Sequence, residues 1–159
     1  MRGLYRLLLL GFLLGGCTAE DATGPGEVRW DRESCTRCAM AVSDRHFSAQ
    51  VRGGAAGQKT QLYKFDDIGC AVVWLDGQPW KDDTRTEIWV MDQLSGEWID
   101  ARLARYVTGK VTPMDYGLGA QHESSPGSMD FTAAREHSYA VDAQKHLHGG
   151  GRLHSGTGE

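Results

Sequence analysis

Residues 64–79, KFDDIGCAVVWLDGQP, contain the end of a strand, the start of a helix and a helix stop in direct succession. Asp66 or Asp67 is a favourable N-cap, because a carboxylate accepts hydrogen bonds from the free N–H groups of a first helical turn. Gly77 and Pro79 end the pattern. The apolar residues between these signals recur at helical spacing: Ile68, Ala71, Val72 and Leu75. The sequence therefore predicts a helix that follows a strand without a linker.

Two hairpins are expected on either side of this helix. Upstream, residues 46–51 alternate apolar and polar, residues 53–57 (GGAAG) form a turn, and residues 59–65 return as the second strand. Downstream, residues 87–92 and 96–100 form the second hairpin, with a cross-strand contact possible between its two tryptophans. This spacing favours small antiparallel sheets.

The remaining elements complete a mixed architecture. Residues from 101 onward favour a short helix or a loop, and residues 131–139 favour a helix. A faint internal echo places a methionine before an apolar stretch in each half, at Met40 and Met114. We therefore expect an α+β fold of two small related units, each an antiparallel hairpin plus a helix.

Length and composition fit one small domain. The chain has 159 residues, of which 24% are charged and 40% hydrophobic, close to globular averages. Its 21 acidic and 17 basic residues give a net charge of -4, which argues against a nucleic-acid partner, since such a protein needs a basic face. The folded domain is expected over residues 30–142.

The two ends of the chain read as separate segments. Residues 1–16 combine arginines with a short leucine-rich run and lead into Cys17 through small residues, which is typical of a lipoprotein signal. Lipidation of Cys17 would anchor the chain to a membrane. Residues 17–29 are expected to be a flexible tether, and residues 143–159 a disordered Gly/His tail.

The residues that carry chemistry begin at Cys35, Cys38 and Met40, which place three sulfur atoms close together. A Cys-x-x-Cys pair suits a thiol–disulfide oxidoreductase best at a helix start, and the residues that follow look extended. A structural zinc site normally needs four ligands, and Cys70 is solitary on the apolar face of the expected helix. A Cu(I) site fits thiolate and thioether donors together, and this reading is favoured.

Other candidate ligands lie further along the chain. Met114 sits in the loop TPMDYG, where core packing explains a methionine poorly. His46, near the sulfur cluster, and His122, after the Met114 loop, are weaker candidates for a nitrogen donor. The tail histidines His146, His148 and His154 are expected to add a weak site for divalent metal. No motif of a nucleotide-binding loop or a Ser/His/Asp triad is present.

The order of these motifs resembles the NosL family, lipoproteins that accompany nitrous oxide reductase. The resemblance is carried by the lipobox, Cys-Ala-Met at 38–40, KFDDIGC at 64–70, the hairpin ending in WIDA at 98–101, and Thr-Pro-Met at 112–114. It implies a Cu(I)-binding protein with a fold similar to a domain of organomercurial lyase. It also implies Cys38, Met40 and Met114 as copper ligands, with Cys35 less widely shared in the family. The chain departs from the family pattern at Asp115 and over residues 121–130.

The resulting expectation is a metallochaperone without enzymatic activity, anchored by its lipid and facing the periplasm, with the outer membrane preferred. Its partner would be nitrous oxide reductase or the membrane transporter that assembles the reductase. Two alternatives stay open: a general copper-sequestering lipoprotein, and a thiol–disulfide oxidoreductase.

Overall fold

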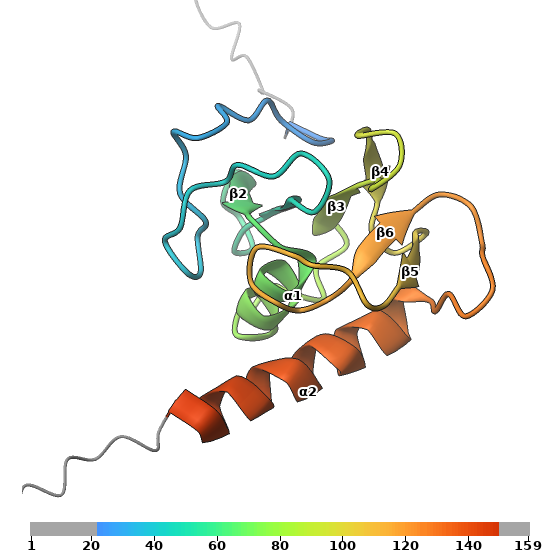
Figure 1. Cartoon of the computed structure of the whole chain (residues 1–159). Coiled ribbons are helices and arrows are strands. Elements are labelled where there is room, and N and C mark those ends of the chain that lie inside the picture. Colours follow the sequence, from blue (N-terminus) through green and yellow to red (C-terminus); the bar gives the residue numbers. More distant parts are fainter. Residues whose placement is uncertain (1–21, 150–159) are drawn as a thin grey trace, which may run out of the picture.

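The two antiparallel hairpins and the capped helix expected from the sequence are present, and with a further strand pair and a second helix they build an α+β fold. The computed structural model describes residues 22–149 (Figure 1). One sheet has the strand order β2-β1-β3-β4, and a second sheet pairs β5 with β6. The elements are β1 (Ala49–Gly53), β2 (Gln61–Phe65), α1 (Ile68–Asp76), β3 (Glu87–Met91), β4 (Trp98–Asp100), β5 (Arg105–Val107), β6 (Gly119–Gln121) and α2 (Phe131–Gly149).

The first unit consists of the β1–β2 hairpin and α1, with the β3–β4 hairpin added along β1. All three strand pairings are antiparallel, and Ala49 of β1 lies between Phe65 of β2 and Val90 of β3. All five residues of β1 are buried, because the strand is central in its sheet. The predicted cross-strand tryptophan pair is not directly opposed: the register places Trp98 opposite Met91 and Trp89 opposite Asp100.

Helix α1 begins where the sequence predicts, and the structure selects Asp67 as its N-cap. The Asp67 carboxylate accepts a hydrogen bond from the backbone N–H of Gly69 at 3.1 Å, and Gly77 caps the other end. Gly69 is required by packing, because a Cβ at this position would lie 2.1 Å from the Tyr116 ring. The first turn of α1 is thereby pressed against the loop that contains Tyr116.

The second unit consists of the β5–β6 hairpin and α2. Residues 101–103 form a turn and the chain then enters β5, so the segment after residue 101 is a loop and a strand instead of a helix. Helix α2 packs along α1 and against β5 (Figure 1). It continues to Gly149, so the prediction of a disordered tail from residue 143 is wrong over residues 143–149. Residues 150–159 lie outside the described part.

The segment before the first strand is also more ordered than predicted. The Gly26 backbone N–H donates to the Gln50 side-chain oxygen at 2.8 Å, and the Gln50 amide donates back to the Gly26 carbonyl at 2.8 Å. Val28 is buried. Residues 22–29 therefore pack on the sheet, and the expected free tether is corrected for this part.

The expected signal segment 1–16 and the lipidation site Cys17 lie outside the described residues. Among the helices of residues 22–149, none combines the length and the apolar character needed to cross a bilayer.

Candidate metal centre

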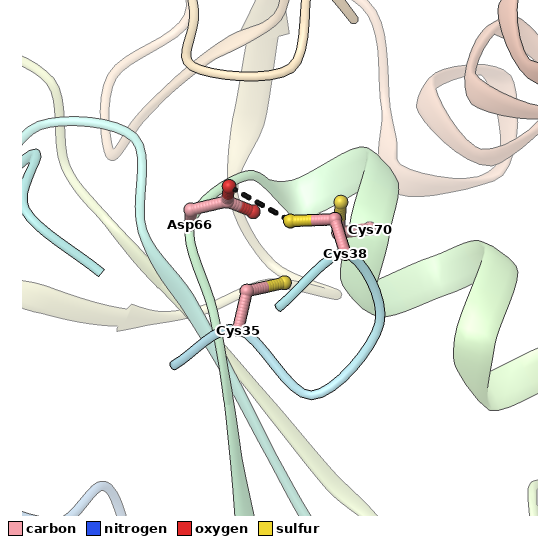
Figure 2. Close-up of side chains that lie close together, drawn as sticks. All are labelled: Cys35, Cys38, Asp66 and Cys70. Carbon is pink, nitrogen blue, oxygen red and sulfur yellow. Dashed lines mark hydrogen bonds between the residues drawn. The ribbon is translucent and has the colours of Figure 1, made fainter. Parts of the chain in front are cut away.

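Three separate segments bring together four side chains of types that can ligate a metal ion. Cys35 and Cys38 come from the loop before β1, Asp66 from the end of β2, and Cys70 from the first turn of α1 (Figure 2). One ligand atom from each residue, a sulfur or a carboxylate oxygen, lies within 4.8 Å of every other. We call these four residues the thiol cluster. Its residue types and spacing allow it to hold a metal ion.

The shape of the Cys35–Cys38 loop is set by backbone hydrogen bonds. The Cys35 N–H donates to the Met40 carbonyl at 2.7 Å, and the Ala39 N–H donates to the Cys35 carbonyl at 3.0 Å. Ala39 adopts a left-handed conformation with φ of 63°, which closes this tight turn. The Thr36 N–H donates to the Lys64 carbonyl at 2.8 Å and fixes the loop to β2. Both sulfur atoms are thereby held beside the end of that strand.

Cys70 joins the cluster because a capped helix starts directly at the strand end. Asp66 directly follows β2, Asp67 caps α1, and Cys70 lies in the turn that the cap initiates. The Cys70 side chain is completely buried. The same strand–helix junction that the sequence predicts therefore carries two of the four cluster residues.

The three thiols differ in exposure and in acidity. Cys35 and Cys70 are buried, whereas Cys38 is only half-buried and supplies the sulfur nearest to solvent. A hydrogen bond from the Cys70 thiol lowers the pKa of Cys35 to about 6, against the effect of burial. Burial raises the pKa of Cys38 to about 12, and the hydrogen bond to Cys35 raises the pKa of Cys70 strongly. At neutral pH the cluster therefore holds one thiolate and two thiols.

Asp66 faces the cluster with one oxygen paired and one unpaired. The Cys38 thiol donates a hydrogen bond to Asp66 Oδ2, with 3.1 Å between sulfur and oxygen (Figure 2). Asp66 is 1% exposed, and its Oδ1 is buried with no hydrogen-bond partner in the described residues. An unpaired buried carboxylate oxygen is rare and costs free energy, so it indicates a missing partner.

A network around Arg37 holds the cluster loop against the second unit. The Arg37 guanidinium donates to Asp142 of α2 at 2.7 Å and to the Tyr116 hydroxyl at 2.9 Å. The Tyr116 hydroxyl donates to the same Asp142 carboxylate at 2.8 Å. Lys145, one turn further along α2, donates to the Met114 carbonyl. The loops that precede β1 and β6 therefore meet over the end of α2.

The structure brings together two of the residues predicted as ligands, Cys35 and Cys38. Met40 follows them in the same loop, and 52% of its surface is exposed. Met114 is half-buried against the core, and its backbone N–H lies 3.3 Å from the Asp67 carboxylate. The Cys38 loop and the Met114 loop thus border the consecutive residues Asp66 and Asp67, and the convergence of their sulfur atoms on one ion stays a prediction.

The two candidate histidines lie outside the thiol cluster. A ring nitrogen of His46 is 3.0 Å from the Gln93 carbonyl oxygen. His122 is exposed, with a ring nitrogen 4.0 Å from the Glu123 carboxylate. Neither histidine belongs to the group of four side chains that the structure brings together.

Sequence reasoning missed Cys70 and Asp66 as site residues. Cys70 was assigned to the apolar face of α1, and Asp66 was considered only as a cap. The spacing of the two residues was the available signal. Asp66 follows a strand, and Cys70, four residues later, lies in the first turn of the next helix. Their side chains can therefore lie close together. Cys70 also completes a set of three thiols with the Cys35–Cys38 pair.

Comparisons with known protein families, curated proteins and solved structures found no match to this chain. The functional argument below therefore starts from the thiol cluster itself.

Proposed function

We propose that the protein is a Cu(I) metallochaperone, held at a membrane by lipid on Cys17 and facing the periplasm, that supplies copper for the assembly of nitrous oxide reductase. The observation that supports the metal is the convergence of three thiols within 4.8 Å in the thiol cluster. The client, the anchor and the compartment rest on the resemblance to the NosL family.

Cu(I) suits this cluster because the ion is soft, favours thiolate sulfur and accepts only two or three ligands. With metal–sulfur bonds of about 2.3 Å, a trigonal site needs sulfur atoms about 4 Å apart, a separation that the cluster allows. Cys38 is the half-exposed member of the three. A partner's sulfur ligand can approach the ion from this side, as transfer between proteins requires.

The proposed resting ligands are Cys35, Cys38 and Cys70. Met40 and Met114, which the family resemblance implies, are proposed to assist the outgoing ion. The exposed Met40 side chain is two residues from Cys38, and the Met114 loop contacts the residue next to Asp66. Thioethers carry no charge and bind the ion more weakly than thiolates, which suits a transient role.

Serine substitution tests the ligand set. Cys38→Ser and Cys70→Ser should each remove most Cu(I) binding in an anaerobic competition with a chromophoric chelator, because serine does not bind a soft ion. Thr36→Ser, in the same loop, is the matched control and should bind as the wild type does. Unchanged Cu(I) affinity in Cys70→Ser would show that Cys70 is not a ligand and would favour Cys38, Met40 and Met114 as the ligand set.

Delivery needs its own assay. Copper should pass from the loaded protein to apo-nitrous oxide reductase faster than it passes to solution. Copper that stays bound in the presence of the apo-reductase would instead favour a sequestering lipoprotein.

One observation favours a second candidate, thiol–disulfide exchange: the Cys35 thiol has a pKa of about 6 and two further thiols beside it. Insulin-reduction activity that persists in Met40→Ala and Met114→Ala would support this function. Activity absent from the wild-type protein would exclude it.

A further inference from the structure

Asp66 Oδ1 accepts no hydrogen bond from the described residues, although it is buried. Asp66 is 1% exposed and Oδ1 is fully enclosed, so water does not satisfy it from the surface. Its carboxyl group is turned toward the three sulfur atoms (Figure 2). The only cluster donor to this carboxylate is the Cys38 thiol, on Oδ2.

Metal binding would remove even that donor. A thiol that coordinates a metal must lose its proton, so the Cys38-to-Asp66 hydrogen bond disappears when Cys38 becomes a ligand. The carboxylate would then face three thiolates in a buried site. The Arg37 guanidinium lies beside the Cys70 thiol, but it is also paired with Asp142 at 2.7 Å, so its single positive charge is shared and offsets only part of this negative charge. A carboxylate in this position is stabilised best by coordinating the ion directly.

The charge of the bound ion decides how much negative charge of the thiolates and the carboxylate stays uncompensated. Three thiolates and one carboxylate carry four negative charges. A monovalent ion leaves a net charge of about -3, whereas a divalent ion leaves about -2, and uncompensated charge is costly in a buried site. An oxygen ligand added to three sulfurs also completes the four-coordinate tetrahedral shell of zinc.

We propose that the thiol cluster also binds a divalent thiophilic ion of the Zn(II) class, with the Cys35, Cys38 and Cys70 sulfurs and Asp66 Oδ1 as its four ligands. A tetrahedral site needs sulfur atoms about 3.8 Å apart and a trigonal site about 4 Å, so the same three thiols serve both ions. Asp66 is the residue that distinguishes them. Divalent and monovalent ions therefore compete for one site.

This inference shares its thiols with the proposed function but depends on neither Cu(I) nor a client protein. Binding forms three metal–sulfur bonds and one metal–oxygen bond, and it releases to solvent the protons that the three thiols still carry. No oxidation or reduction takes place.

The test uses the reduced full-length protein, titrated with Zn(II) and with Co(II) as a spectroscopic probe. Wild type should bind one Co(II) with the intense visible bands of a tetrahedral site and with sulfur-to-cobalt charge transfer. Asp66→Asn keeps the side-chain shape and removes the anionic oxygen. Zn(II) affinity should fall at least about tenfold, because loss of an outer-shell partner already costs that much and a direct ligand should cost no less. Cu(I) affinity should change much less.

Asp115→Asn, at an exposed position of the neighbouring loop, is the matched control and should bind both ions as wild type does. X-ray absorption on the Zn(II)-loaded wild type should count three sulfur neighbours and one oxygen neighbour, and it requires no variant to fold. The proposal is overturned if the wild type binds no Zn(II) or gives octahedral Co(II) spectra. Equal Zn(II) affinity in Asp66→Asn would also overturn it.

The two proposals fail separately. Zn(II) binding without Cu(I) binding would reject the copper function alone, and Cu(I) binding without Zn(II) binding would reject this inference alone.

Discussion

The protonation of the thiol cluster predicts how the proposed Cu(I) binding depends on pH. The pKa of Cys35 is lowered to about 6, while that of Cys38 is raised to about 12 and that of Cys70 is also raised. Above about pH 6 the metal-free cluster therefore carries two protons, and below it three. Binding as three thiolates releases all of them, so acid weakens the affinity.

The number of protons released on binding sets how steeply the Cu(I) affinity changes with pH. Each proton released changes the apparent binding constant tenfold per pH unit, so affinity should rise about 100-fold per unit between pH 7 and 9. Below pH 6, where Cys35 is also protonated, the change should steepen toward about 1000-fold per unit.

The assay is an anaerobic competition against a chromophoric Cu(I) chelator, with the chelator's own protonation subtracted and a reductant that contains no thiol. The result discriminates between two ligand sets. A site made of Cys38 with the thioethers of Met40 and Met114 releases a single proton, because thioethers carry none. A wild-type slope of about tenfold per unit between pH 7 and 9 would therefore refute the three-thiolate site.

Three further outcomes are expected. Gly69→Ala places a methyl group within 2.1 Å of the Tyr116 ring, so it should lower the free energy of unfolding by about 1–3 kcal/mol in a denaturant titration, and an unchanged midpoint would contradict this packing. Asp67→Ala removes the α1 cap and the acceptor of the Thr112 hydroxyl, at 2.6 Å, and should cost about 1–2 kcal/mol by the same measurement; a neutral effect would show that the cap is dispensable. His46→Ala should leave Cu(I) affinity unchanged in the chelator competition, since the ring contacts a backbone carbonyl away from the cluster, and weaker binding would restore it as a ligand.

Local patterns were sufficient to predict the strand–cap–helix junction. Residues 61–76 form β2, the Asp67 cap and α1 because strand alternation, a capping carboxylate and helical spacing agree within a few residues. The α+β class followed from this junction and the two hairpins. Cys35 and Cys38 were recognisable as a pair because they are close in sequence.

The remainder of the site depends on contacts between distant segments. Helical periodicity treats Cys70 as an apolar core residue, and only the docking of the 35–40 loop on β2, through Thr36 and Lys64, turns its thiol into a neighbour of the other two. The last turns of α2 were missed for the same reason. Their low hydropathy suggests disorder, yet Asp142 and Lys145 are held by partners from earlier loops.

Asp66 and Asp67 are joined by one peptide bond, but their carboxylates contact different parts of the structure. Asp66 faces the sulfur atoms, whereas the Asp67 carboxylate holds Thr112 and the Met114 backbone in the neighbouring loop. An ion bound at Asp66 would therefore lie one residue away from the carboxylate that anchors the Met114 loop.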